Sequence, residues 1–408
     1  MKSSNSFKLN IAVIFHQEVT FGGGYQQSIN SALLLKKLPK KYFVINFFTL
    51  KKKNIEVLRK YKIKANFLNL SPISKLIIFI KTQPRYILIK NILRLFNINS
   101  KFESKLINKK IDIVYFLSPT RIAADLNKLN YIYTLWDICH RDEVEFPEVR
   151  DCEIFEFRDA LCKNVLPRAQ SIIVDSEFSK KNISERYSIQ KSRLHVIPFE
   201  PSFGVKYFKN IKNSNSKFSI NKNSYIFYPA QFWAHKNHTY LIDGVLSLEK
   251  DYGYKINIIF TGSDKGNLNY IKDYVRQKKI SKRVDFLGFV SDEKVIEIYK
   301  NSLALVMPSY FGPTNIPPLE AFHLGVPLIY SDNYDNKKII GDAGLAVDLN
   351  NEKSLSFELY RLITDSKLRS IIINKGYKKL EEINSINRLK VLEKLMRGFY
   401  RKKITYKF

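Results

Sequence analysis

The residues best suited to holding a phosphorylated ligand lie in the stretch PSYFGPTNIPPLEAFHLGVP, residues 308–327, directly after an apolar run. Pro317 and Pro318 lack amide N–H groups and suit the first turn of a helix, which Thr314 or Asn315 would cap. The glycine and proline near the end of the stretch mark where that helix stops. The loop of Pro313, Thr314, Asn315 and Ile316 therefore offers amide N–H groups, proline apart, that would face a phosphate at a helix N-terminus.

The carboxylate of this stretch, Glu320, lies one turn into the predicted helix. It would repel a phosphate at the same spot, so it is better placed beside the phosphate, accepting hydrogen bonds from sugar hydroxyls. An ordinary surface glutamate, favoured by the helix dipole, is the alternative for an isolated residue of this kind.

A second candidate is the stretch YPAQFWAHKNH, residues 228–238. Lys236 stands near the predicted start of a helix, where its ammonium and the helix N-terminus would together hold a diphosphate. Gln231 would add a neutral hydrogen bond. His235 and His238 have no nearby third metal ligand, which favours an exposed helix start for both.

Two further stretches follow predicted strands in the first half. The glycines of FGGGYQQ, Gly22, Gly23 and Gly24, would let backbone amides approach a negative group, although a simple strand-to-helix turn is about equally favoured. The segment contains neither a dinucleotide fingerprint nor a P-loop. In TLWDICH, His140 is a candidate hydrogen-bonding or proton-transferring group, while Asp137 is expected to orient the loop. A purely structural role is slightly favoured for each residue on the sequence alone.

The elements that position these residues read as buried strands separated by helices. Continuous apolar runs of strand length favour parallel sheets covered on both faces. They occur at residues 11–15, 43–48, 111–117, 131–136, 171–176, 194–198, 225–230, 256–262, 284–288, 303–308 and 327–332. The fold class predicted is α/β, with two doubly wound, Rossmann-like domains, and ligands are expected at the carboxyl ends of the strands.

The 408 residues exceed one typical core, which also favours two domains. We expect an N-terminal domain over 1–206 and a polar linker over 207–224. A C-terminal domain over 225–385 would follow, and a last helix over 386–408 would extend it or pack back on the first domain.

Together these motifs resemble the retaining GT-B glycosyltransferases of family four, the glycosyl transferases group 1. The resemblance covers nearly the whole chain and is densest from 225 to 345. It implies that Lys236 binds the nucleotide diphosphate and that Glu320 holds the ribose. Gln231 and Gly312 stand where the family has an arginine and a first glutamate, so these two positions depart from its pattern. The resemblance further places His140 near the transferred hexose and Phe289 in the base pocket.

The reaction implied by the resemblance moves a hexose, mannose-type or similar, from a nucleotide-sugar to a glycan or lipid-linked glycan, with retention of configuration. It would serve surface polysaccharide or lipopolysaccharide biosynthesis. No cofactor and no metal are expected, because a cationic side chain and helix ends would stabilise the leaving diphosphate. A nucleotide-sugar epimerase of the same fold and a non-catalytic partner in a glycan-assembly complex are the alternatives.

The charge of +30 is unevenly placed, because residues 1–102 hold 19 Lys or Arg against Glu18 and Glu56. Residues 71–110 mix apolar residues with nine Lys or Arg and one acid, which suits docking to an anionic membrane; a solvated basic face is at least as favoured. Nucleic-acid binding is disfavoured because no recognised module is present. We expect a cytoplasmic protein, peripheral on the inner membrane face if the basic region docks, since no apolar run is long enough to span a bilayer. Three unpaired cysteines indicate neither disulfides nor zinc.

Overall fold

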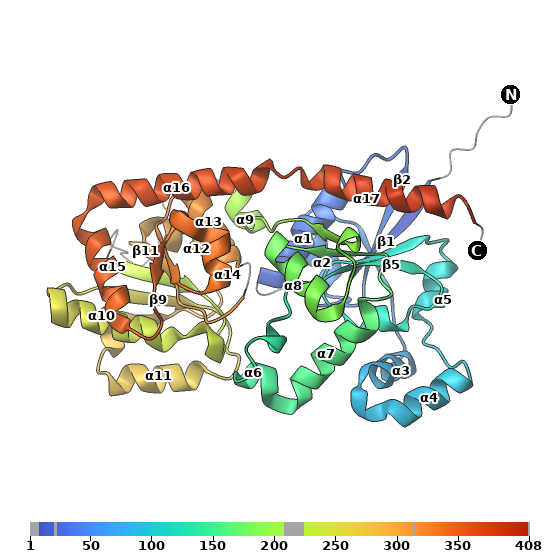
Figure 1. Ribbon diagram of the computed structural model, residues 1–408, viewed down its shortest axis with the longest axis horizontal. Coiled ribbons are helices and arrows are strands. Elements are labelled where there is room, and N and C mark those ends of the chain that lie inside the picture. Colours follow the sequence, from blue (N-terminus) through green and yellow to red (C-terminus); the bar gives the residue numbers. More distant parts are fainter. Residues whose placement is uncertain (1–7, 20–22, 208–223, 313–314, 407–408) are drawn as a thin grey trace. The chain divides into compact units, whose positions relative to one another are not determined.

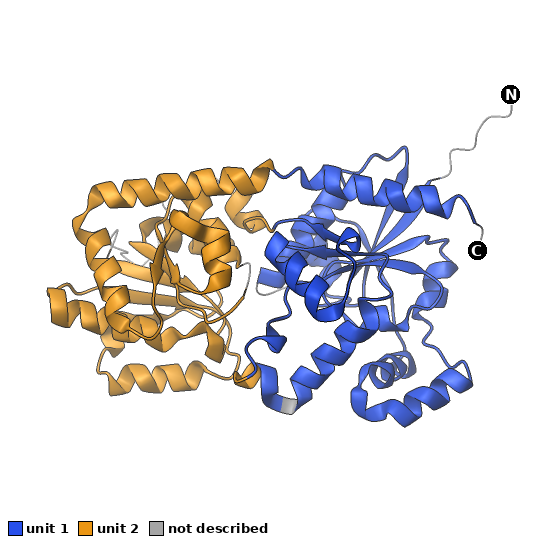
Figure 2. Ribbon diagram, in the orientation of Figure 1, with its two compact units in different colours: residues 1–144, 149–198, 386–408 blue, residues 145–148, 199–385 orange. Residues whose placement is uncertain are grey.

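The computed structural model describes residues 8–19, 23–207, 224–312 and 315–406. The chain forms two compact units, each built of a parallel sheet with helices on both faces (Figures 1 and 2). Unit 1 comprises residues 1–144, 149–198 and 386–408, and unit 2 comprises 145–148 and 199–385. The predicted α/β class with two Rossmann-like sheets is confirmed.

Unit 1 contains a seven-stranded parallel sheet in the order β3-β2-β1-β4-β5-β6-β7. Its strands are β1 Leu9–Phe15, β2 Phe43–Thr49, β3 Ala65–Phe67, β4 Ile113–Phe116, β5 Asn130–Thr134, β6 Ser171–Val174 and β7 Leu194–Val196. Its helices are α1 Gly23–Leu35, α2 Asn54–Lys60, α3 Pro72–Thr82, α4 Ile87–Leu95, α5 Phe102–Ile107, α7 Ile154–Val165, α8 Glu177–Tyr187 and α17 Arg388–Lys403, and the four-residue α6 Pro147–Arg150 straddles the division between the units.

Unit 2 contains a six-stranded parallel sheet in the order β10-β9-β8-β11-β12-β13. Its strands are β8 Tyr225–Pro229, β9 Asn257–Thr261, β10 Val284–Phe286, β11 Ala304–Met307, β12 Leu328–Ser331 and β13 Leu345–Val347. Its helices are α9 Phe203–Tyr207, α10 His238–Tyr252, α11 Leu268–Gln277, α12 Asp292–Asn301, α13 Ile316–Leu324, α14 Tyr334–Ile340, α15 Glu352–Thr364 and α16 Ser366–Ser385.

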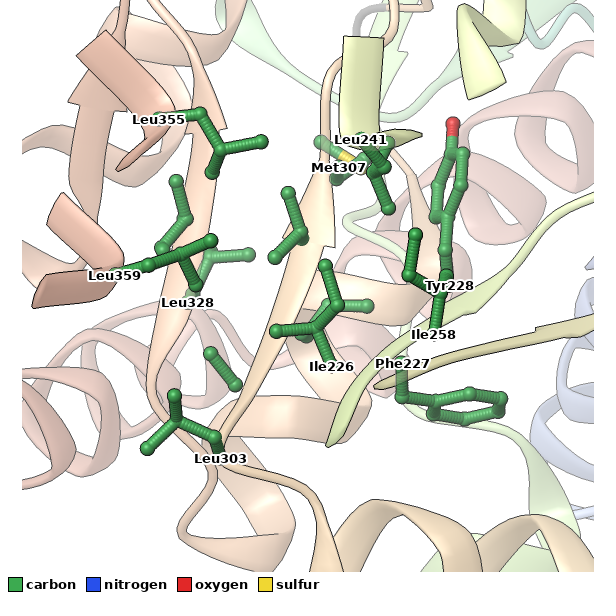
Figure 3. Packing of buried hydrophobic residues seen from close by; sticks show 14 of the residues in the cluster. Ile226, Phe227, Tyr228, Leu241, Ile258, Leu303, Met307, Leu328, Leu355 and Leu359 are labelled. Carbon is green, nitrogen blue, oxygen red and sulfur yellow. The ribbon is translucent and has the colours of Figure 1, made fainter. Parts of the chain in front are cut away.

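The central strands are apolar throughout because both faces of each sheet are covered. In unit 2, Ile226 and Phe227 of β8 pair in register with Ala304 and Leu305 of β11. Figure 3 shows Ile226 among side chains from the neighbouring strands, with Leu355 and Leu359 of α15 closing one side of the cluster. Burial of this surface from water holds the strand ends in place, and with them the loops that carry the candidate site.

Short elements and long-range associations differ most from what the pattern predicts. The three-residue edge strands β3 and β13 are absent from the expected set. The last helix belongs to unit 1, where Leu392, Leu395 and Phe399 are buried. Most of the expected linker lies outside the described residues. Within the described residues, no helix is both long and apolar enough to cross a membrane.

Candidate functional site

The candidate donor site lies where the strand order of unit 2 reverses. After β8 the chain continues through β9 and β10 on one side, then returns to place β11 on the other side of β8. Loops that leave β8 and β11 therefore diverge from a common point at the carboxyl edge of the sheet, which is where open α/β sheets bind ligands. The two most specific motifs of the second half follow these two strands.

Lys236 joins the two loops. It follows β8 in a short 3₁₀ turn, Ala234–Lys236, and its Nζ donates to Asn315 Oδ1 at 3.1 Å and to Ser309 Oγ at 3.4 Å. The side chain is half-buried, so its ammonium stays accessible beside the N-terminus of α13. A cation next to a helix N-terminus suits a phosphate or diphosphate.

Hydrogen bonds behind Lys236 fix the loop that follows β11. The buried hydroxyls of Tyr228 and Ser309 share a hydrogen bond of 2.8 Å. The carbonyl of Ser309 accepts from Ser331 Oγ at 2.6 Å and from Asn333 Nδ2 at 3.3 Å. Since these partners come from β8, from β12 and from the residue that caps α14, the loop is held at the sheet edge from several sides.

Helix α13 begins and ends at the residues that the sequence predicts. Asn315 occupies the N-cap position, Pro317 and Pro318 lie in the first turn, and Gly325 ends the helix in the left-handed conformation. The side chain of Asn315 donates to the carbonyl of Gly312 at 2.8 Å instead of capping the helix. Ile316 is buried. Pro313 and Thr314 lie outside the described residues.

Gly312 has a φ of +118°, a backbone conformation that side chains with a Cβ rarely adopt. Glycine at this position, where the family pattern has a glutamate, is therefore consistent with the backbone conformation of this loop. A carboxylate introduced at position 312 would strain the backbone as well as add a charge.

Glu320 points into unit 2. Its side chain is buried, and it accepts a hydrogen bond from the hydroxyl of Tyr299 at 3.0 Å and another from Ser202. Burial raises the pKa of the Glu320 carboxyl, while the bonds from Ser202 and Tyr299 oppose that shift. The carboxylate thus links α13 to α12 and to the segment before α9. It is therefore not the ordinary surface glutamate that the sequence left as an alternative.

The other predicted donor residues surround the same edge. Gln231 is half-buried, and its Oε1 accepts from the indole N–H of Trp233 at 3.1 Å. Phe289 follows β10 with 61% of its surface exposed, so its ring is accessible to a planar group.

The expectation for the two histidines of this region is wrong. His235 and His238 are buried, not exposed at a helix start. His238 stacks on Phe232 with ring centroids 4.6 Å apart, and burial followed by the charge of Lys236 lowers its pKa to about 3. Aromatic packing across unit 2, invisible in the local pattern, decides both positions.

His235 is held by residues 145–148, a segment from the first half of the chain that belongs to unit 2. The amide of His235 donates to Glu148 Oε1 at 2.9 Å, and its ring contacts the same oxygen. The ring also stacks on Phe311, and Phe146 packs against Phe311 with ring centroids 5.3 Å apart. This segment therefore braces both loops of the candidate donor site, a role with no sequence signal.

Unit 1 carries the remaining predicted residues. Gly23 and Gly24 open α1, and a Cβ at Gly24 would overlap the ring of Trp136. The glycine-rich turn thus lies against the WDICH segment, which the sequence could not show. Gly22 lies outside the described residues.

His140 is fully buried in unit 1, with Nε2 3.1 Å from the hydroxyl of Tyr187. That hydroxyl donates its only proton to Asp159 Oδ1 at 3.0 Å, so Nε2 of His140 must donate to the Tyr187 oxygen. Nδ1 is then an unprotonated acceptor without a hydrogen-bond partner among the described residues. Burial, and next the charge of Arg158, lower the pKa of His140 to about 4, so the ring is neutral at pH 7. Asp137 accepts from Arg158 at 2.5 Å and from the amide of Cys139, as expected for a loop-orienting carboxylate.

The two parallel Rossmann-like sheets have the architecture of the GT-B fold. Residues 210–379 match the family model described as glycosyl transferases group 1.

The relatives are distant. The chain is 22% identical over 239 residues to the O-antigen chain mannosyltransferase B of Escherichia coli, covering 56% of this chain and 61% of that protein. It is 24% identical over 194 residues to the O-antigen chain mannosyltransferase RfbU of Salmonella typhimurium, covering 48% of this chain and 51% of the relative. The matched region thus spans about half to three fifths of these relatives.

Among solved structures, HepE of Anabaena in complex with UDP-glucose superimposes with a TM-score of 0.69 at 14% identity, covering 96% of this chain and 100% of that one. At that identity the likeness shows the fold alone.

Proposed function

We propose that this protein is a retaining glycosyltransferase that moves a hexose, mannose-type or similar, from a nucleotide-sugar to a glycan acceptor. The observation that carries the proposal is the meeting of Lys236 with the N-terminus of α13 at the switch point of unit 2. O-antigen chain mannosyltransferases among the distant relatives support both the sugar and a role in surface polysaccharide biosynthesis.

In this proposal Lys236 and the amides at the start of α13 stabilise the negative charge that develops on the leaving diphosphate. A cationic side chain and a helix end supply the charge that a metal would otherwise provide. Glu320, oriented by Tyr299, accepts hydrogen bonds from the ribose, and the exposed ring of Phe289 contacts the base.

Thermal-shift measurements with GDP-mannose, UDP-glucose and dTDP-glucose test the donor site. One donor should raise the melting temperature of the wild-type protein. Lys236→Met should weaken binding of that donor by about ten- to a hundredfold, because a hydrogen bond to a charged group is lost. Lys250→Met, at an exposed lysine in the last turn of α10, is the matched control and should bind as the wild type does.

NMR of the product then separates the functions. An α-linked product from an α-linked donor supports retaining transfer, whereas an altered sugar still on its nucleotide would identify an epimerase. If no nucleotide-sugar binds, the donor proposal fails and a non-catalytic partner is favoured.

We also propose that unit 1 docks on an anionic membrane through α3 and α4. None of the residues of α4 is buried. Leu88 and Leu95 are 75% and 80% exposed, and Ile73 of α3 is 70% exposed. So large an exposed apolar surface marks an interaction site.

The positive charge around this surface favours an anionic membrane as its partner. Leu88, Ile92 and Leu95 recur at the spacing of one helical face, while Lys90 and Arg94 are four residues apart on another. Residues 71–102 contain no Asp or Glu. An apolar face opposite a cationic face suits a helix that lies in the interface of an anionic membrane, which is where a lipid-linked acceptor would lie.

Co-sedimentation with vesicles tests the docking. Wild-type protein should bind phosphatidylglycerol-containing vesicles and bind pure phosphatidylcholine far less. The double variant Leu88→Ser, Leu95→Ser should lose most of this binding, and Phe357→Ser, at a 48% exposed residue of unit 2, should retain it. Binding that ignores anionic lipid, or a wild-type dimer in light scattering that the double variant abolishes, would contradict membrane docking.

A further inference from the structure

Unit 1 contains a cavity of about 540 Å³ at the switch point of its own sheet. Residues 16–18 of its wall follow β1, and residues 119–121 follow β4. These strands are neighbours, yet the chain leaves β1 toward β2 on one side and places β4 on the other. The cavity therefore lies where such sheets bind ligands, its volume suits a small ligand, and unit 1 alone supplies its wall.

Within the part of the chain that the structure describes, two cations in the wall form no ion pair with a carboxylate. Among the described residues, neither Lys51 nor Arg121 takes part in an ion pair, and Arg121 instead lies over the ring of Phe157, 4.6 Å from its centroid. Arg158, also in the wall, is neutralised by Asp137 at 2.5 Å. The remaining positive charge is thus carried by Lys51 and Arg121.

His16 reports the electrostatic potential inside the cavity. Its Nδ1 lies 3.2 Å from the hydroxyl of Ser118. Burial, followed by the charges of Lys51 and Arg121, lowers the pKa of His16 to about 4. Glu18 is also in the wall, but it is exposed and does not counter this effect. An anion would therefore be favoured there.

The rest of the wall is apolar. Phe157, Leu135 and Leu161 line the cavity beside the hydroxyl-bearing Tyr133 and Thr120. Aromatic and aliphatic side chains with a few polar groups suit a sugar ring, whose C–H faces pack against the former and whose hydroxyls bond to the latter.

We propose that this cavity binds the acceptor through an anionic group, a phosphate ester or a carboxylate, held between Lys51 and Arg121. The inference rests on the proposed transfer reaction and names its acceptor class: a phosphorylated or acidic sugar, with its ring against Phe157. Neither residue belongs to the motifs that the sequence singles out.

Calorimetric titration of the full-length protein tests the proposal with three probes: mannose 6-phosphate, glucuronate and neutral mannose. Excess GDP and UDP are present to occupy the candidate donor site, so that the heat measured does not come from acidic sugars binding there. At least one acidic sugar should bind about tenfold or more tightly than mannose, and the stronger of the two identifies phosphate or carboxylate as the group recognised.

Lys51→Gln should weaken that binding about tenfold or more, and the exposed position of Lys51 keeps the fold intact. Lys52→Gln, at the next exposed lysine, is the matched control and should bind like the wild type. Arg121→Gln should have the same effect as Lys51→Gln.

Equal binding of mannose and the acidic sugars, or unchanged binding in Lys51→Gln, would overturn the inference. If donor stabilisation persists while no acidic sugar binds, the anionic acceptor alone is wrong. If no nucleotide-sugar stabilises the protein, the proposed function fails independently of this cavity.

Discussion

Single residues of the candidate site are recognisable in the sequence, but their partners are not. Lys236 and Asn315 are 79 positions apart, and only the adjacency of β8 and β11 brings them to 3.1 Å. The same holds for Glu320, whose partners Tyr299 and Ser202 come from separate segments. Residue types and their place after a strand predict the donor site, because strand ends are local features, whereas hydrogen bonds between loops are not.

Buried histidines give the protein a predictable response to acid. The pKa of His238 is about 3 in the folded state and 6.5 without perturbation, so the unfolded state binds its proton first as pH falls. This contribution to stability is complete above about pH 6.5 and is lost as pH drops toward 3. Between pH 7 and pH 5 the loss is about 2 kcal/mol for one such histidine.

Urea denaturation of His238→Phe checks this expectation. The phenyl ring keeps the stacking on Phe232 and removes the titrating group. Its free energy of unfolding should therefore fall by about 2 kcal/mol less than that of the wild type over the same pH interval. An identical pH dependence in the two proteins would show that His238 is not buried as described.

At the scale of elements, prolines and glycines at helix ends predict where a helix begins and ends. How closely two helices pack depends instead on small residues at their contact. α13 begins at prolines and ends at Gly325 as the sequence predicts, because these signals are local. The contact between α10 and α15 is different. A Cβ at Gly244 of α10 would overlap the side chain of Leu355 on α15, and nothing in the periodicity of either helix indicates this.

Gly244→Ala should lower the free energy of unfolding by about 1–3 kcal/mol, because an overpacked helix contact forces the backbone to shift. Gly398→Ala is the matched control, since no atom lies within 4 Å of the added Cβ on α17. That substitution should leave stability unchanged or raise it by up to about 1 kcal/mol, through helix propensity. Chemical denaturation of both variants measures the difference, and equal effects would argue against close α10–α15 packing.

At the scale of the whole molecule, neither unit is formed by one continuous stretch of the sequence. Residues 145–148 belong to unit 2 although unit 1 surrounds them in sequence, and residues 386–408 return to unit 1 after the whole of unit 2. α17 packs against α1, and Arg397 lies over the ring of Tyr42 with 4.1 Å to its centroid. The stability of unit 1 therefore depends on the last residues of the chain.

Phe399→Ala tests this dependence, because Phe399 of α17 is only 2% exposed. Loss of its buried ring should destabilise unit 1 by about 3–5 kcal/mol. Hydrogen exchange should accelerate in β1 and α1 while amides of β8 and β11 keep their protection. Ile404→Ala, at a 58% exposed residue just after the same helix, should leave exchange unchanged. Faster exchange in unit 2 instead would assign α17 to the other unit.

The sequence by itself determined the α/β class, the central strands and the residues at which α13 begins and ends, because each depends on runs and spacings within a few dozen residues. Only the tertiary structure decided which loops meet. It paired Lys236 with Asn315, buried His235 and His238, placed Trp136 against Gly24, and opened the cavity between Lys51 and Arg121. Such contacts depend on strand order and side-chain packing across long separations, and the local period of a sequence does not record either.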